Sequence, residues 1–340
     1  MAKIALSRSA FFHNLSLLAQ KLGNKERIAV VLKDNAYGHG LIPMAELANA
    51  FGIIRAVVRT VEEAEAVAHL FDEILILNPR TPSSVDARFT LVVNDLDTLS
   101  TLPPHTRVDL KIDTGMHRNG LHAADLKKAF SLLIQQRLQL NGVMTHFRSA
   151  DILGSELFWQ TARWKSVKQE VLRLCGIHAL PKPLFHSANS AAVLRLNHYD
   201  DDYARCGIAT YGYHEMPKPF GPYDLKPVLK LYAQKITTLS LKKGERIGYG
   251  GTFAAPLDMR VSTYDIGYGD GLFRYDGEGE CFLNGHKVLG KISMDSFSAE
   301  GDAEEICIIG DAKEIAHAFG TISYDLLVKL NPLIPRVVVP

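Results

Sequence analysis

The side chain with the clearest chemical potential in this sequence is Lys33, in the stretch VLKDNAYGHG at residues 31–40. It directly follows the apolar run IAVVL at residues 28–32, so we expect it at the end of a β-strand. A lysine amine can form a Schiff base with a carbonyl compound, and burial favours its reactive neutral form. Because most lysines at strand ends are solvated surface residues, Lys33 alone indicates no function.

Four further polar motifs follow or overlap other apolar runs and contain the remaining barrel candidates. They are LKIDTGMHRNGL at residues 110–121, THFRSAD at 145–151, HSANSAA at 186–192 and RCGIATYGY at 205–213. Taken singly, each has a structural interpretation: His146 as a core histidine, Arg205 as a surface charge, Ser190 as a helix N-cap. The motifs therefore indicate chemistry only through their shared position in the fold.

The elements that would position these motifs alternate between β-rich runs and amphipathic segments of helical period. Eight such runs predict a (β/α)8 TIM barrel rather than a doubly wound sheet. The predicted strands cover residues 28–32, 53–58, 73–77, 90–94, 108–112, 140–145, 183–187 and 207–211. The predicted helical segments cover residues 41–51, 61–71, 124–136 and 155–175, with short ones at 82–87 and 96–102. Active sites of these barrels lie at the C-terminal strand ends, where Lys33 and the motifs fall.

A second, mostly β domain is predicted after the stretch PKPFGPYDLKP at residues 217–227, whose four prolines indicate a linker. We place the barrel at residues 1–226 and the second domain at 227–340. Asn284-Gly285 lies between apolar runs and predicts a two-residue hairpin turn. Strands are expected at residues 229–239, 259–268, 280–294 and 304–310, and short helices at 313–318 and 324–330.

Composition excludes several classes of partner and site. Lys plus Arg (38) nearly balances Asp plus Glu (37), so we expect neither nucleic acid nor an anionic membrane as partner. The cysteines, at positions 175, 206, 281 and 307, form no CxxC pair, which disfavours a disulfide framework or a structural metal site. The first twenty residues lack a long apolar region, and no run approaches 18 apolar residues. We therefore expect a cytoplasmic protein.

The motifs, taken in order, resemble the signature blocks of the alanine racemases, which are enzymes of fold type III that use pyridoxal 5′-phosphate (PLP). The blocks quoted above are joined in the second domain by IGYGGTF at residues 247–253, IGYGDG at 266–271 and GKISMD at 290–295. The resemblance covers the chain from end to end. It implies a PLP-binding (β/α)8 barrel, an additional β-domain, and a homodimer whose active sites share residues between subunits.

The resemblance implies a two-base mechanism. Lys33 corresponds to the lysine that binds PLP covalently and then acts as a base on one face of the substrate Cα. Tyr249 corresponds to the base on the other face and comes from the partner subunit. His146 and Arg205 correspond to residues that support this tyrosine, and Arg205 also faces the pyridine nitrogen. Because a guanidinium stays protonated, it cannot give that nitrogen a proton, and we expect side reactions such as transamination to be suppressed.

The same resemblance implies the phosphate contacts of the cofactor. They correspond to Tyr37, Ser190 and the backbone amides of Gly207 and Ile208, and Asn189 lies beside them. This placement agrees with the phosphate sites of TIM barrels, which commonly lie over the loops after strands seven and eight.

The substrate contacts are implied by the blocks at 110–121 and 290–295. Arg118 and the backbone amide of Met294, the latter from the partner subunit, correspond to groups that bind the substrate carboxylate. Lys111 corresponds to a lysine that is often carbamylated and orients the arginine. Tyr268 and Asp295 resemble residues at the site entrance, where a narrow opening would favour small amino acids.

The sequence departs from the usual family pattern at five positions, none of which removes a group named above. Asp34 replaces a common alanine, His117 a glycine, Cys206 a proline and Gly248 a serine. A tyrosine near the C-terminus that contacts the phosphate in some members is replaced by Pro332. We therefore expect one phosphate contact fewer and weaker PLP retention.

The function implied is interconversion of L- and D-alanine, supplying D-alanine for peptidoglycan. There are three alternatives. A racemase of broader specificity, or one for serine, would keep every catalytic group. A non-enzymatic PLP-binding protein would lack the second domain with Tyr249, and a fold type III decarboxylase would have an acidic residue in place of Arg205.

Overall fold

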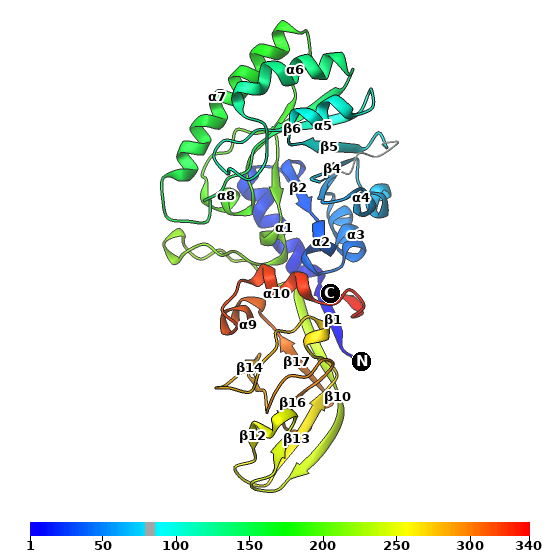
Figure 1. Ribbon diagram of the computed structural model, residues 1–340, viewed down its shortest axis with the longest axis vertical. Coiled ribbons are helices and arrows are strands. Elements are labelled where there is room, and N and C mark those ends of the chain that lie inside the picture. The colour runs from blue at the N-terminus through cyan, green and yellow to red at the C-terminus, as the bar shows by residue number, and fades with distance from the viewer. Residues whose placement is uncertain (79–85) are drawn as a thin grey trace.

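The computed structural model describes residues 1–78 and 86–340 and shows an upper barrel joined to a lower, mostly β part (Figure 1). Within the described residues, eight parallel strands form one sheet in the order β8-β7-β6-β5-β4-β3-β2-β9. Their bounds are β2 Ile28–Val31, β3 Arg55–Val58, β4 Glu73–Ile76, β5 Phe89–Val93, β6 Arg107–Lys111, β7 Gln139–Met144, β8 Leu184–His186 and β9 Ala204–Cys206. An isolated parallel bridge between Asn189 and Arg205 closes the ring between β8 and β9. The predicted TIM barrel is therefore confirmed.

Two helices of the barrel begin at residues whose side chains cap their first turn. Thr60 accepts a hydrogen bond from Glu63 N–H (3.3 Å) at the start of one helix, and Asp95 accepts one from Thr98 N–H (2.7 Å) at the start of another. The helices are α1 Arg8–Leu22, α2 Lys33–Tyr37, α3 Leu41–Phe51, α4 Val61–Val67, α5 Leu96–Thr101, α6 Leu126–Gln135, α7 Glu156–Ile177 and α8 Ser190–Arg195. The short helix predicted at 82–87 falls largely outside the described residues. Of the described helices, none has the length and apolar character needed to cross a bilayer.

The eighth strand differs from the prediction. Residues 207–211, GIATY, were predicted to be a strand because they are β-branched and aromatic, but the strand is β9 at 204–206 and Ile208–Tyr211 form a 3-10 helix, η4. Gly207 breaks the extended backbone with φ −111° and ψ −100°. Tyr211 is fully buried, and its hydroxyl donates to Val31 O (2.8 Å). The apolar pattern thus reflects burial of η4 against β2, and the true strand carries Arg205.

The second part of the molecule is a mixed sheet with two short helices. The main strands are β10 Leu229–Leu241, β13 Met259–Tyr264, β16 Phe297–Glu300 and β17 Glu305–Ile309, and the helices are α9 Ala312–Ala318 and α10 Ser323–Lys329. Two hairpins add β11 Arg246–Ile247 with β12 Phe253–Ala254, and β14 Phe282–Leu283 with β15 His286–Lys287. Asn284 and Gly285 both have positive φ (48° and 84°) between β14 and β15, so the predicted hairpin turn is confirmed.

Both ends of the chain contribute strands to this second sheet. The strand β1, Lys3–Ser7, pairs antiparallel with β10 and parallel with β18, Arg336–Val339. Residues 1–226 were predicted to form the barrel domain. The assignment of the first strand to that domain was wrong. The division near residue 226 stays a prediction. The physical reason is the strand pattern: in the alternating segment KIALS, Ile4 and Leu6 have no exposed surface, and the backbone pairs with β10 and β18.

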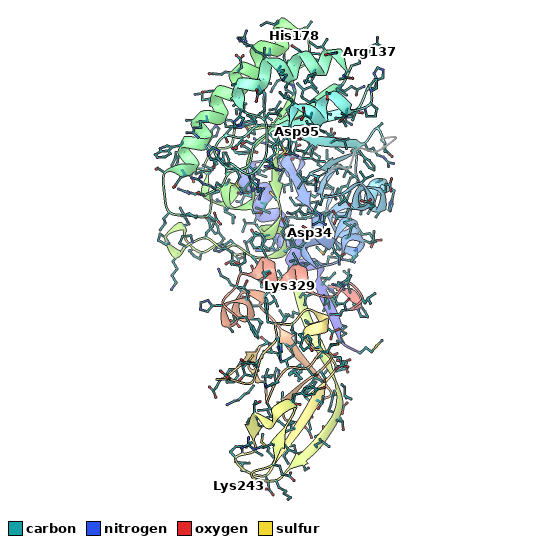
Figure 2. All side chains as sticks on the ribbon, viewed as in Figure 1. Asp34, Asp95, Arg137, His178, Lys243 and Lys329 are labelled. Atoms are coloured by element: carbon teal, nitrogen blue, oxygen red, sulfur yellow. The ribbon has the colours of Figure 1, made fainter. Side chains whose placement is uncertain are left out.

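The two parts meet where α10 packs against α2, immediately after Lys33. Figure 2 labels Asp34 on the barrel side of this junction and Lys329 on the side of α10. Gly38, with φ 79°, is required here because a Cβ would lie 1.8 Å from Leu327 O. The second part of the molecule therefore holds the segment that follows Lys33 in place.

Candidate active site

A cavity of about 610 Å³ lies at the C-terminal ends of the barrel strands. Its wall includes ten of the predicted site residues: Lys33, Tyr37, Lys111, Arg118, His146, Asn189, Ser190, Arg205, Gly207 and Ile208. Among the described residues, six cationic side chains and two carboxylates line it, the cations being Lys33, Arg59, Lys111, Arg118, Arg148 and Arg205. This excess of positive charge suits a ligand that carries anionic groups.

Lys33 begins an unusual left-handed turn. Strand β2 ends at Val31, one residue before the predicted end at Leu32, and the four residues Asp34 to Tyr37 all have φ between 51° and 55°. Such a run in residues other than glycine costs roughly 1 kcal/mol or more per residue and occurs mainly at functional sites. Asn35 stabilises the turn by accepting a hydrogen bond from Leu41 N–H (2.8 Å). The result places Lys33 Nζ 5.9 Å from the centre of the Tyr37 ring, on one wall of the cavity.

Asp34 and Arg59 form an ion pair beside Lys33. Asp34 Oδ1 lies 2.7 Å from Arg59 Nη1, and its Oδ2 lies 3.8 Å from Lys33 Nζ. These side chains are partly exposed, so solvent screens the pair. Asp34 was recognised only as a departure from the family pattern, and Arg59 was not predicted as a site residue.

Arg205 is buried and almost fully hydrogen-bonded. Its Nη1 donates to His186 Nδ1 (2.7 Å) and His186 O (2.9 Å), and its Nη2 donates to Thr145 O (2.7 Å) and Ser187 O (3.2 Å). No described residue accepts from Nε, and Arg205 lines the cavity. The guanidinium therefore has one N–H left to donate to a ligand.

His146 and His186 are neutral acceptors for this arginine. His146 Nδ1 lies 3.4 Å from Arg205 Nη2. Because a guanidinium only donates, both imidazoles must carry a lone pair on Nδ1. Burial first, and the positive charge of Arg205 second, lower the pKa of His146 to about 3. His146 can consequently accept at Nδ1 and donate at Nε2, but it is a weak base.

The region predicted to bind phosphate is built around Ser190. Its Oγ accepts hydrogen bonds from Gly207 N–H (2.9 Å) and Ala209 N–H (3.3 Å), which leaves the hydroxyl hydrogen free to donate to an anion. The Gly207 amide would have to exchange this partner to bind phosphate itself. A Cβ at Gly207 would lie 2.7 Å from Tyr37 Oη, so this approach of the two walls requires a glycine. Asn189 caps α8 through Ala192 N–H (3.0 Å).

Lys111 is the last residue of β6, and Arg118 lies on the segment that follows it. Burial first, and the charges of Arg118 and Arg205 second, lower the pKa of Lys111 to about 8. Its Nζ donates to Asn119 Oδ1. Leu121 N–H donates to Lys111 O (2.8 Å), which closes the segment into a loop and turns Arg118 toward the cavity. A lysine with this lowered pKa has a substantial neutral fraction near physiological pH.

The predicted site residues of the second part lie elsewhere. Among the described residues, Tyr249, Tyr268, Met294 and Asp295 are absent from the cavity wall. Tyr249 is 75% exposed in the 3-10 helix η6, Tyr249–Gly251, and Met294 is 62% exposed. Tyr268 N–H donates to Ser293 O (3.1 Å), and Gly269 N–H to Met294 O (2.7 Å). The protomer therefore contains two separate groups of predicted site residues.

Three further residues, one on the cavity wall and two that support Arg205 behind it, were not predicted. His186 lies inside the motif HSANSAA but was not singled out, and Asp109, which contacts it, is a charge within the apolar strand VDLKI. The signal that could have found them is the position of these polar residues within apolar runs, which are expected to be buried strands of the barrel. Tyr324 comes from α10 and lines the cavity, with its ring 5.9 Å from that of Tyr37. Nothing local in the sequence around Tyr324 indicates this contact.

Comparisons with known proteins agree over the full chain. A family model described as alanine racemase, N-terminal domain, matches residues 6–215, and one described as alanine racemase, C-terminal domain, matches residues 228–338. The alanine racemase of a Nitratiruptor species is 53% identical over 338 residues, 99% of each chain. The structure of the Bacillus anthracis alanine racemase with bound L-Ala-P has a TM-score of 0.86 at 26% identity, covering 100% of this chain and 95% of that one. A histidine racemase from Leuconostoc mesenteroides subsp. sake has a TM-score of 0.85 at 26% identity, covering 100% and 98%.

Proposed function

The chain belongs to the alanine racemase family, and from this membership we propose that it interconverts L- and D-alanine with PLP and supplies D-alanine for peptidoglycan in the cytoplasm. It is an isomerase. The observation that carries the proposal is the cavity that combines Lys33 with the single unpaired N–H of Arg205.

The cavity fits PLP on three independent features. Its volume of about 610 Å³ is that of a small-molecule site, and its cations suit a phosphate and a substrate carboxylate. Ser190 offers a hydroxyl donor beside the close contact of Gly207 and Tyr37. Lys33 supplies an amine for covalent attachment. When bound, PLP withdraws electrons from the substrate Cα and makes its proton acidic.

Arg205 determines what the pyridine nitrogen of the cofactor receives. We propose that Arg205 would hold the pyridine nitrogen through its Nε–H, since the other N–H groups are bonded within the protein. A guanidinium does not transfer its proton, so Arg205 would leave that nitrogen unprotonated and would limit the electron withdrawal that a bound cofactor supplies. This moderates the acidity of the Cα proton and disfavours transamination.

Inversion at Cα requires a proton to leave one face and another to arrive on the opposite face. We assign one face to Lys33. Three other titratable groups on the cavity wall are poor bases: the pKa of His146 is lowered to about 3, and burial raises the pKa of Tyr37 and Tyr324. We assign the second base to Tyr249 of a partner subunit, as the family resemblance implies, because Tyr249 is 75% exposed and absent from the described wall of its own protomer's cavity.

His146 links Arg205 to that tyrosine. With Nδ1 accepting from Arg205, its Nε2–H is the group available to donate to the phenolate oxygen of the partner subunit's Tyr249. Such a bond stabilises the anionic form, which a base requires, because a free tyrosine has a pKa of about 10.

The substrate contacts follow the same division between subunits. We propose that Arg118 and the partner's Met294 amide bind the substrate carboxylate, and that Tyr268 and Asp295 of the partner narrow the entrance. Carbamylation of Lys111 would replace a positive charge beside Arg118 with a negative one. The lowered pKa of Lys111 supports this modification, since only the neutral amine combines with carbon dioxide.

A homodimer is supported by exposed apolar side chains on both parts. On the barrel, Ile152 (55%), Leu153 (56%) and Trp159 (63%) are exposed and follow Asp151, a residue of the cavity wall, closely in the sequence. On the second part, Tyr249 and Met294 are exposed. Two exposed sets of this kind, one beside the cavity and one bearing its missing groups, suit a head-to-tail interface.

The test is to load the purified protein with PLP and follow exchange of the α-hydrogen of each alanine enantiomer in D₂O. Exchange and inversion of both enantiomers are expected, and retention of the α-hydrogen in both would overturn the proposal. Serine and histidine should be run in parallel, because discrimination between side chains rests on pocket contacts worth only ~1–3 kcal/mol. A faster rate with either would keep the reaction and change the substrate.

A further inference from the structure

We propose that Asp109 is a positioning residue that acts through His186 to fix Arg205 and so the N–H presented to the cofactor. The inference rests on the proposed function. Asp109 lies on β6, His186 on β8 and Arg205 on β9, and their side chains meet inside the barrel.

The three side chains form a continuous hydrogen-bonded chain. Asp109 Oδ2 lies 2.7 Å from His186 Nε2, and His186 Nδ1 lies 2.7 Å from Arg205 Nη1. Asp109 and His186 have no exposed surface, and Arg205 is 5% exposed. Water therefore cannot substitute for any link without entering the barrel.

Neighbouring residues pack closely around Asp109 and His186. A Cβ at Gly142 would lie 2.6 Å from Asp109 Oδ1, so only glycine leaves room for the carboxylate. The ring of Tyr203 stacks on the His186 ring at 4.3 Å between centroids and 17° between planes. Asn141 Nδ2 donates to the second oxygen of Asp109 (3.2 Å). Asp109 and His186 are thus each held in a single orientation.

The donor and acceptor pattern gives the chain a direction. Arg205 can only donate, so His186 must keep a lone pair on Nδ1 and carry its proton on Nε2. A carboxylate is the partner that accepts from this proton, and Asp109 supplies it. Without Asp109, the alternative tautomer would place an N–H of His186 against an N–H of Arg205. Arg205 would then leave its present position, and its Nε–H would no longer be presented to the cofactor.

The decisive comparison is Asp109→Ala with Asp201→Ala. Asp201 is another buried carboxylate, 4% exposed, and binds Trp164 Nε1 (2.9 Å), Lys168 Nζ (2.7 Å) and Ser187 Oγ. Burial lowers the pKa of the Arg205 guanidinium and both carboxylates oppose this shift, but only Asp109 is hydrogen-bonded to the His186 ring, which accepts a hydrogen bond from Arg205. The two variants therefore separate the effect of losing a nearby charge from the effect of losing the hydrogen bonds that connect Asp109 to Arg205.

In the Asp109→Ala holoenzyme we expect the PLP dissociation constant to rise about tenfold or more, as is typical for loss of such supporting partners, and the absorbance spectrum of the bound cofactor to change. Asp201→Ala should lower the melting temperature without these changes. Equal PLP affinity and an equal spectrum in the two variants would overturn the inference. Absence of PLP binding or racemisation in the wild type would instead overturn the proposed function.

A second pair of variants covers the case in which Asp109→Ala does not fold. In His186→Asn the amide oxygen can accept from Arg205 in place of Nδ1, whereas His186→Leu offers no acceptor. We expect His186→Asn to retain more PLP affinity than His186→Leu, and adding Asp109→Ala to His186→Asn to change that affinity little. Equal PLP affinity in His186→Asn and His186→Leu would contradict the proposed link from Asp109 through His186 to Arg205.

Discussion

Lys33 and Tyr249 carry the proposed chemistry from opposite sides, so a variant of either should affect the two enantiomers differently. Tyr249→Phe removes the base from one face and leaves Lys33 on the other. We expect racemisation to fall by roughly 10²–10⁴-fold, while exchange of the α-hydrogen persists with one enantiomer only. Isotope exchange followed by NMR with each enantiomer measures this.

The control for that experiment is Lys33→Ala, which should abolish covalent PLP attachment and exchange with both enantiomers. If Tyr249→Phe exchanged both enantiomers at the wild-type rate, the assignment of the second base would be wrong, whatever the family.

Buried neutral histidines make stability sensitive to acid. The pKa of His39 is lowered to about 4, chiefly by burial, so between pH 6.5 and 4 the unfolded chain binds a proton that the folded chain does not. Stability should therefore fall as pH falls through this window. His39→Gln is expected to reduce the slope of unfolding free energy against pH by up to about 1.4 kcal/mol per pH unit.

Urea unfolding of the wild type and His39→Gln at several pH values between 4 and 7 measures the difference. The matched control is His122→Gln, which removes a histidine from an exposed position. A slope for His39→Gln equal to that of the wild type would show that the imidazole is charged in the folded protein.

At the scale of elements, the left-handed turn after Lys33 depends on its contact with α10. Gly38→Ala would place a methyl group 1.8 Å from Leu327 O and add strain at φ 79°. We expect a loss of several kcal/mol in stability and weaker PLP binding, because α2 must move away from α10. Unfolding and PLP titration measure the two effects.

Gly23→Ala separates strain from contact. Gly23 has a similar φ of 82°, but nothing lies within 4 Å of the added methyl group. This variant should cost only about 1–2 kcal/mol, which is the conformational penalty. Equal losses in the two variants would mean that the contact with α10 contributes nothing.

The element pattern was largely predictable, and the side-chain network was not. Alternating apolar periods located seven strands and the hairpin at Asn284-Gly285, because burial dictates those periods. The same logic failed at 207–211, where β-branched and aromatic residues are buried in a 3-10 helix. The chain from Asp109 to Arg205 joins strands far apart in sequence, and no local signal specifies which buried polar groups meet. The left-handed turn could be anticipated only in that Asp and Asn tolerate positive φ.

At the scale of the whole molecule, the proposed sharing of sites between subunits can be tested by mixing. Lys33→Ala and Tyr249→Phe should each be inactive as homodimers. If Tyr249 acts across the interface, each mixed dimer contains one complete site. Random exchange places about half of the chains in mixed dimers, so roughly a quarter of the wild-type activity should return.

The alternative arrangement gives the opposite result. If Tyr249 served the cavity of its own chain, both sites of every mixed dimer would lack one base and no activity would return. Size-exclusion chromatography with light scattering confirms that the subunits have exchanged, and mixing each variant with itself supplies the baseline.

The pairing of β1 with β18 has a consequence for biosynthesis. Because Ile4 is registered with Arg336, the first strand to leave the ribosome cannot complete its sheet until nearly the whole chain has been made. The barrel is in effect an insertion between β1 and β10, two neighbouring strands of one sheet, and its strands can pair before β1 has either of its partners. The surface that carries Tyr249 is therefore completed last. Because Tyr324 of α10 also lines the cavity, both the cofactor site and the surface offered to a partner are completed only near the end of synthesis.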